Sequence, residues 1–141
     1  VVLMSSTLKM PSTVCGIIED SGFTSYSAMA SYNARRMVPK FIPACLIVMI
    51  LALGAKVFGG FSIYKVDPRQ ALKKEILPVL FIHGSADLWA PVAMAYELYD
   101  CCAGEKDLLI IEGANHGECY KIDPLKYEAK VVTFIQQHKK N

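Results

Sequence analysis

The chain has 141 residues, 53% hydrophobic and 20% charged, with 15 basic and 13 acidic side chains and a formal net charge of +2. This composition is too apolar for a disordered chain, and its charge balance does not indicate a nucleic-acid partner. The length allows one domain with a hydrophobic core but excludes a complete eight-stranded barrel of parallel βα units, which needs about 200 residues or more. We therefore expect a single domain over residues 1–141.

The first predicted elements are a strand and a helix. Residues 14–18 form a β-branched apolar run that stops at Glu19 and Asp20, which predicts a buried strand followed by a turn. Thr24 is placed to cap a helix that runs to about Met37.

The most apolar part of the sequence lies between Lys40 and Lys56. Its uncharged residues, 41–55, are fewer than the roughly 20 that a membrane span needs, so we expect no membrane partner for this segment. Residues 44–58 are apolar on every side, which predicts a covered helix or a lid over a pocket. We assign residues 24–66 to a lid-like helical segment.

Two later helices have the same start signal, an acidic cap followed by proline. Asp67 precedes Pro68, and Asp123 precedes Pro124. The side chain of the acid accepts backbone N–H groups of the first turn, and proline suits the first helical position because it has no N–H. The second of these helices is predicted to extend to near His138 from its apolar spacing.

Two more buried strands are predicted at residues 78–82 and 108–111, with a helix between them that begins near Pro91 and stops before Gly104. Three continuous apolar strands separated by helices predict an α/β fold with a parallel sheet that is covered on both faces.

Polar side chains that could carry chemistry follow all three predicted strands: Asp20, Asp87 and His116. The carboxyl ends of parallel strands meet at one rim of the sheet, so an acid and a histidine there can orient each other for general-base catalysis. Each residue also has a structural interpretation. Asp20 could form a turn, Asp87 could cap the helix at Pro91, and His116 could be a solvated loop residue.

Three segments resemble the α/β-hydrolase family. Residues 78–91, PVLFIHGSADLWAP, resemble its acid-bearing motif, and residues 112–117, EGANHG, resemble its histidine loop. Residues 16–25 resemble the strand and turn after the nucleophile helix in the serine-aminopeptidase-like branch of bacterial esterases and peptidases. The resemblance covers nearly the whole chain. It implies the C-terminal half of such a fold, with three parallel strands, covering helices and a helical lid segment.

The resemblance also implies a reaction, the hydrolysis of an ester- or amide-type acyl substrate by a Ser-Asp-His triad without a cofactor. His116 would be the base and Asp87 the acid that orients it. The family's G-x-S-x-G nucleophile motif does not occur here. Residues 1–8 look like the helix that follows the motif, so we expect the serine upstream of Val1, and the isolated chain to be inactive as an enzyme.

Other nucleophiles in the chain fit less well. Ser5 and Ser6 have no flanking glycines or preceding strand, Ser85 has no strand-to-helix elbow, and Cys119 has no role in the family. The number of cysteines is odd, and no C-x-x-C pair occurs, so neither a disulfide framework nor a metal site is indicated. Free thiols favour a reducing compartment such as the cytoplasm, although any targeting signal would lie upstream.

As partners we expect a small-molecule acyl substrate with an apolar group, and self-association through a sheet edge that the half-fold leaves exposed. A different function class fits the same sequence. The chain could be a non-catalytic α/β module that binds a partner or a second copy, with Asp87 and His116 serving only as loop residues.

Overall fold

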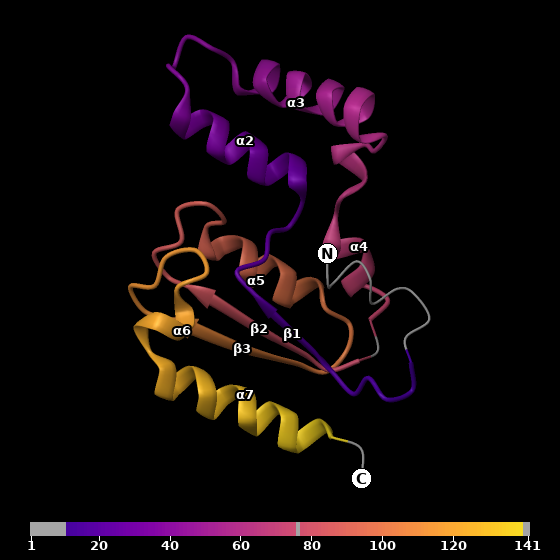
Figure 1. Cartoon of the computed structure of the whole chain (residues 1–141), viewed down its shortest axis with the longest axis vertical. Helices are drawn as coiled ribbons and strands as arrows, with labels where there is room; N and C mark the ends of the chain where they lie inside the picture. Colours follow the sequence, from indigo (N-terminus) through magenta and orange to yellow (C-terminus); the bar gives the residue numbers. More distant parts are fainter. Residues whose placement is uncertain (1–10, 76, 140–141) are drawn as a thin grey trace.

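The computed structural model describes residues 11–75 and 77–139. Its centre is a parallel sheet with the strand order β1 (Ile17–Asp20), β2 (Val79–Gly84) and β3 (Lys106–Ile111). The register pairs Ile17 with Val79 and Val79 with Lys106, so the carboxyl ends of the strands lie at one rim, as Figure 1 shows. The predicted α/β class with three parallel strands is confirmed.

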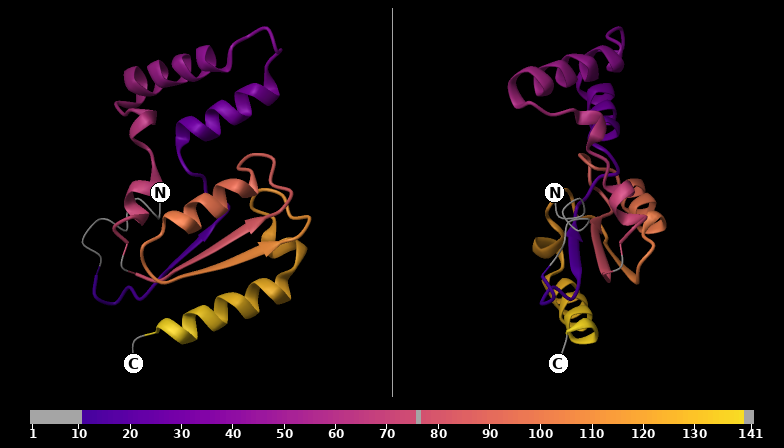
Figure 2. Two further views of the ribbon diagram at one scale, coloured as in Figure 1. Left: turned by 180° about the vertical axis from the view of Figure 1, so that it is seen from behind. Right: turned by 90° about the vertical axis from the view of Figure 1, so that its right-hand side faces the viewer.

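Helices cover both faces of the sheet. Helices α4 (Pro68–Leu72) and α5 (Val92–Cys101) lie on one face, and α6 (Cys119–Ile122) and α7 (Pro124–His138) on the other (Figures 1 and 2). All of β2 is buried, and its side chains alternate between the two faces, so Val79 and Phe81 contribute to one core and Leu80 and Ile82 to the other. The first core contains Ile17, Leu72, Val79, Phe81, Leu98 and Cys102. The second contains Leu80, Ile82, Leu109, Ile111, Ala114, Cys119 and Phe134.

The segment between β1 and α4 projects beyond the sheet (Figure 2). It consists of α2 (Tyr26–Met37), α3 (Ala44–Gly59) and the short 3₁₀ helix η1 (Ile63–Lys65). These elements pack on one another through a small core of their own, formed by Ala30, Val48 and Ile63. Helix α2 begins one residue later than predicted, because the hydroxyl of Ser25, not of Thr24, accepts the N–H of Ala28 at 3.1 Å.

Helix α3 forms as predicted, but the described part of the chain does not cover it. Val48 is its one buried residue, and the large apolar side chains on its opposite side are exposed. Among the described residues no single helix is long and apolar enough to span a membrane. Helix α3 and the segment Ile63–Leu72 pass the same test of length and composition only as a pair bent by 98°.

Strand β1 lies later in the sequence than expected, because it continues through the two acidic residues that were read as a turn. Its pairing runs to Asp20, opposite Ile82. The side chain of Glu19 is buried and accepts the N–H of Gly22, and burial is the main cause that raises its pKa to about 8. A carboxyl that keeps its proton at neutral pH can occupy a strand interior. Within the described residues, the other edge of β1 has no partner strand.

Candidate active site

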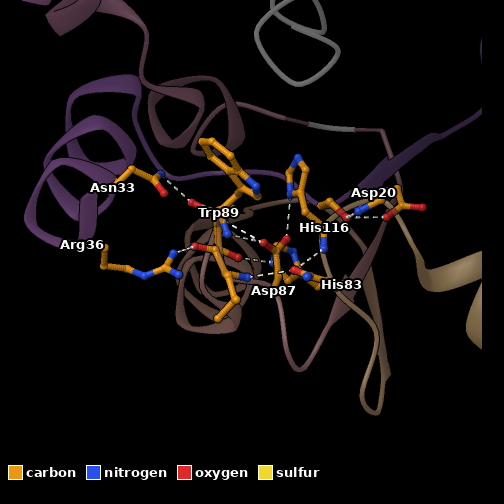
Figure 3. A network of polar contacts seen from close by, with 12 residues as sticks. Asp20, Asn33, Arg36, His83, Asp87, Trp89 and His116 are labelled. Atoms are coloured by element: carbon orange, nitrogen blue, oxygen red, sulfur yellow. Dashed lines mark hydrogen bonds and ion pairs between the residues drawn. The ribbon is translucent and has the colours of Figure 1, made fainter. Parts of the chain in front are cut away.

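The predicted acid and histidine are in direct contact. Nδ1 of His116, in the loop after β3, lies 2.8 Å from Oδ2 of Asp87, in the loop after β2 (Figure 3). The carboxylate accepts, so Nδ1 carries the proton and the other ring nitrogen, Nε2, keeps a free lone pair. In Figure 3 this nitrogen points away from Asp87. The imidazole is 42% exposed, so the arrangement presents a base to an incoming group.

Asp87 is buried and hydrogen-bonded through both oxygens. Its Oδ1 accepts the backbone N–H groups of Trp89 at 2.8 Å and Ala90 at 2.9 Å. The structure does not support the interpretation of Asp87 as the cap of α5, because the N-cap position belongs to Pro91 and no side chain caps it. The two N–H groups instead fix the carboxylate so that its second oxygen is aimed at His116.

A second histidine, within strand β2, contacts the same carboxylate. His83, fully buried in β2, has Nε2 at 2.7 Å from the carbonyl oxygen of Ala90 and at 3.3 Å from Oδ2 of Asp87. A carbonyl can only accept, so Nε2 bears the proton. Among the described residues Nδ1 of His83 has no partner. This geometry gives His83 a structural role, because the residue ties the acid to the end of its own loop.

Side chains from two other parts of the chain brace the acid loop, residues 87–90. Oδ1 of Asn115 accepts the N–H groups of Leu88 at 3.2 Å and of His116 at 2.9 Å, so one amide links the acid loop to the histidine loop. From α2, Arg36 donates to the carbonyl oxygen of Leu88, and Asn33 donates to that of Trp89 at 2.9 Å (Figure 3).

Sequence analysis missed these bracing residues. Asn33 and Arg36 lie three residues apart on one face of α2, which is visible in the sequence, but nothing there identifies a loop more than 50 positions away as their partner. Asn115 has one recognisable signal, its position next to His116.

Gly84 allows the acid and histidine loops to approach closely. A Cβ on this residue would lie 2.2 Å from the carbonyl oxygen of Ala114. The same oxygen accepts the N–H of Ala86 at 3.0 Å, so the two loops are joined at this point. We expected Gly84 to provide a tight turn. The turn is present, because the carbonyl oxygen of Gly84 accepts the N–H of Asp87 at 3.3 Å. The φ of Gly84 is not positive, so the turn does not require glycine, and the space that glycine leaves for Ala114 is what matters.

Asp20 reaches the same rim but has other partners. It accepts from the hydroxyls of Ser21 at 2.9 Å and Tyr127 at 3.1 Å. Ser21 has a positive φ of 61°, and its hydroxyl oxygen accepts the N–H of Gly117 at 3.1 Å. Asp20 thus secures the histidine loop from the side of β1, whereas Asp87 is the acid that contacts the imidazole of His116.

The alternative nucleophiles lie in structural positions or outside the described residues. The hydroxyl of Ser85 accepts the N–H of Gly113 at 2.9 Å. Burial, reinforced by the nearby Asp20, raises the pKa of the Cys119 thiol to about 12, so this thiol stays protonated. Ser5 and Ser6 lie outside the described residues.

An open hollow of about 230 Å³ adjoins the acid loop, lined by Asn33, Arg36, Met37, Leu88, Trp89 and Asn115. Its apolar walls are exposed side chains of α2 and of the acid loop, including Met37 and Trp89.

All five cysteines are free thiols, so Cys101 and Cys102 form no disulfide. No group of three or more potential metal ligands gathers within residues 11–75 and 77–139.

Comparison with known proteins agrees with the fold. No protein-family profile matches the chain. An uncharacterized protein of Bacillus subtilis, YqkD, is 29% identical over 118 residues, which are 84% of this chain and 38% of YqkD. The chain therefore spans well under half of this relative.

Solved structures show the same partial coverage. The esterase Pf2001 of Pyrococcus furiosus superposes with a TM-score of 0.69 at 14% identity, covering 98% of this chain and 50% of the esterase. An acylaminoacyl peptidase of Pyrococcus horikoshii gives a TM-score of 0.62 at 18% identity, covering 99% of this chain and 23% of the peptidase. An α/β fold family hydrolase of Bacillus anthracis gives 0.57 at 16% identity, with 96% and 62% covered. The chain has the fold of part of an α/β-hydrolase.

Proposed function

We propose that the chain is the C-terminal portion of a serine hydrolase that cleaves an ester- or amide-type acyl substrate. The observation that carries the proposal is the 2.8 Å contact between Nδ1 of His116 and the buried carboxylate of Asp87. The similar solved structures include an esterase and an acylaminoacyl peptidase, which supports a hydrolase origin for this half-fold. Within the branches of that fold, the segment at residues 16–25 favours the serine-aminopeptidase-like one.

In the proposed mechanism, Nε2 of His116 takes the proton of a serine hydroxyl as its oxygen attacks the acyl carbonyl carbon. The imidazolium then gives that proton to the leaving group as the acyl bond breaks. In the second half of the cycle, His116 takes a proton from water as the water oxygen attacks the carbonyl carbon of the acyl-enzyme. His116 then gives that proton to the serine oxygen as the acyl–serine bond breaks, which releases the acid and restores the serine hydroxyl. Asp87 holds the tautomer and stabilises the imidazolium in both halves.

We place the nucleophile outside the 141 residues, in a part of the protein upstream of Val1. The sequence has no G-x-S-x-G motif. Ser21 and Ser85, the serines of the described rim, are engaged with backbone N–H groups. On this proposal the chain by itself is inactive. The edge of β1 that has no partner strand among the described residues is where further strands would join, and self-association through that edge remains a prediction.

The hollow beside the acid loop supports our proposal for the substrate class. Its exposed apolar side chains would favour a small molecule with an apolar acyl or alkyl group. The chemistry requires no cofactor, since the nucleophile, the base and the orienting acid are all side chains.

The test is covalent labelling with a fluorophosphonate, read by intact mass, on the chain and on a form extended upstream through a G-x-S-x-G motif. We expect one adduct on the extended form and none on the 141-residue chain. His116→Ala should abolish labelling, and Asp87→Asn should lower the turnover of the extended form by about 10⁴. His138→Ala is the matched control, since His138 lies on α7 and packs on Phe134.

Stoichiometric labelling of the 141-residue chain would show that it holds a nucleophile, and would contradict our placement of the serine. An extended form that carries the motif but does not label would favour the non-catalytic binding module instead.

A further inference from the structure

The lid-like segment carries charge of one sign only. Residues 24–66 contain five basic and no acidic side chains, whereas the rest of the chain has ten basic and thirteen acidic ones. The five are Arg35, Arg36, Lys40, Lys56 and Lys65. The small net charge of the whole chain is therefore the sum of a strongly positive lid-like segment and a slightly negative remainder. Such segregation of charge favours an anionic surface as the partner of the segment.

The same segment exposes an apolar stripe on α3. Leu46, Ile50, Leu53 and Val57 recur at intervals of four, three and four residues, and are 42%, 58%, 63% and 63% exposed. This spacing puts them on one face of a helix, opposite the buried Val48. Figures 1 and 2 show α3 at the outer end of the molecule, with α2 between it and the sheet.

We propose that this outward face of α3 docks into the headgroup region of an anionic lipid bilayer, with the helix parallel to the membrane plane. Exposed apolar side chains would enter the acyl boundary, among them Phe58, which is 92% exposed. Lys56, next to Val57, would reach the lipid phosphates. From its length we expected no membrane partner for this segment. That argument applies only to a helix that spans the bilayer, and parallel docking needs no span.

Two other occupants fit less well. A second copy of the same face would bring two segments of five positive charges together, which repels. A nucleic acid would meet the cations but would leave the aliphatic stripe of α3 unburied, since phosphate contacts come from basic and polar groups. An anionic bilayer satisfies both the charge and the apolar surface.

The experiment is vesicle flotation of the chain with phosphatidylserine-containing vesicles and with phosphatidylcholine vesicles, at low and high salt. We expect partition into the anionic vesicles that falls at high salt. Each basic residue near the surface contributes about fivefold to partition, so Lys56→Glu should lower it by about thirtyfold. Leu53→Asp should lower it by about tenfold or more, because it places a charge in the acyl boundary.

Matched controls separate docking from general adhesion. Lys74→Glu changes an exposed lysine outside the segment, and Leu125→Asp changes an 80% exposed leucine on α7, so both should keep wild-type partition. Circular dichroism would establish that all four variants are folded.

Four results would overturn the proposal. One is equal partition into neutral vesicles, and another is equal loss in the control variants. The third is an oligomer that Leu53→Asp disperses without changing vesicle partition, which would identify a second copy as the occupant. Binding of a single-stranded oligonucleotide without vesicle partition would likewise assign the cations to a nucleic acid and refute lipid docking.

Discussion

The contact between the acid and histidine loops should depend on the absence of a side chain at Gly84. In Gly84→Ala the new Cβ would lie 2.2 Å from the carbonyl oxygen of Ala114 and 2.7 Å from its carbonyl carbon, where ordinary contacts are 3.4–4 Å. The loops would have to separate by about 1 Å, and the atoms in the way are backbone, which cannot rotate aside. We expect the free energy of unfolding to fall by about 1–3 kcal/mol or more.

Urea denaturation measures that loss, and proton NMR reports the site. The His116 Nδ1 proton, held by a carboxylate, should give a low-field resonance in the wild type that shifts or disappears in Gly84→Ala. Gly54→Ala is the control in the opposite direction. It lies inside α3 with no atom within 4 Å of the new Cβ, so it should stabilise by about 0.5–1 kcal/mol. An unchanged urea midpoint in Gly84→Ala would refute the close approach of the two loops.

Three further outcomes follow from the structure. Burial raises the pKa of Glu19 from its ordinary value of 4.5 to about 8, so the carboxyl binds its proton more tightly in the folded than in the unfolded chain. The free energy of unfolding should therefore fall as pH rises between these values, by up to about 1.4 kcal/mol per pH unit. Glu19→Gln should flatten that slope in urea titrations across this range, and a persistent slope would assign it to another group. Iodoacetamide should modify the exposed Cys45 rapidly and the buried Cys119, with its raised pKa, slowly, as mass spectrometry of digests can show. Equal rates would contradict the burial of Cys119. Asn115→Ala should speed hydrogen exchange of the Leu88 and His116 amides, which lose their acceptor, and unchanged rates would deny that role.

The elements with local signals were predictable from the sequence. The caps at Asp67 and Asp123 form as expected, each accepting a backbone N–H of the first turn. The contact between Asp87 and His116 was inferred from two strand ends. Such features depend on a few adjacent residues or on the general geometry of parallel sheets.

Features that depend on tertiary packing were not predictable. Glu19 looks like a turn residue in the sequence. In the folded chain, burial raises the pKa of its carboxyl, and the uncharged carboxyl can then occupy a position within β1. The exposure of α3 and the bracing of the acid loop by Arg36 likewise depend on how the segment after β1 is placed over the sheet. No periodicity in the sequence encodes that placement.

The bracing of the acid loop sets a limit on recombination between related chains. Helix α2 belongs by sequence to the lid-like segment, residues 24–66. Through Asn33 and Arg36 it also provides donors for two carbonyl groups beside Asp87. A chimera that replaces residues 24–66 as a block would leave those carbonyls without their donors, so a productive exchange should begin after Met37 and keep the native α2.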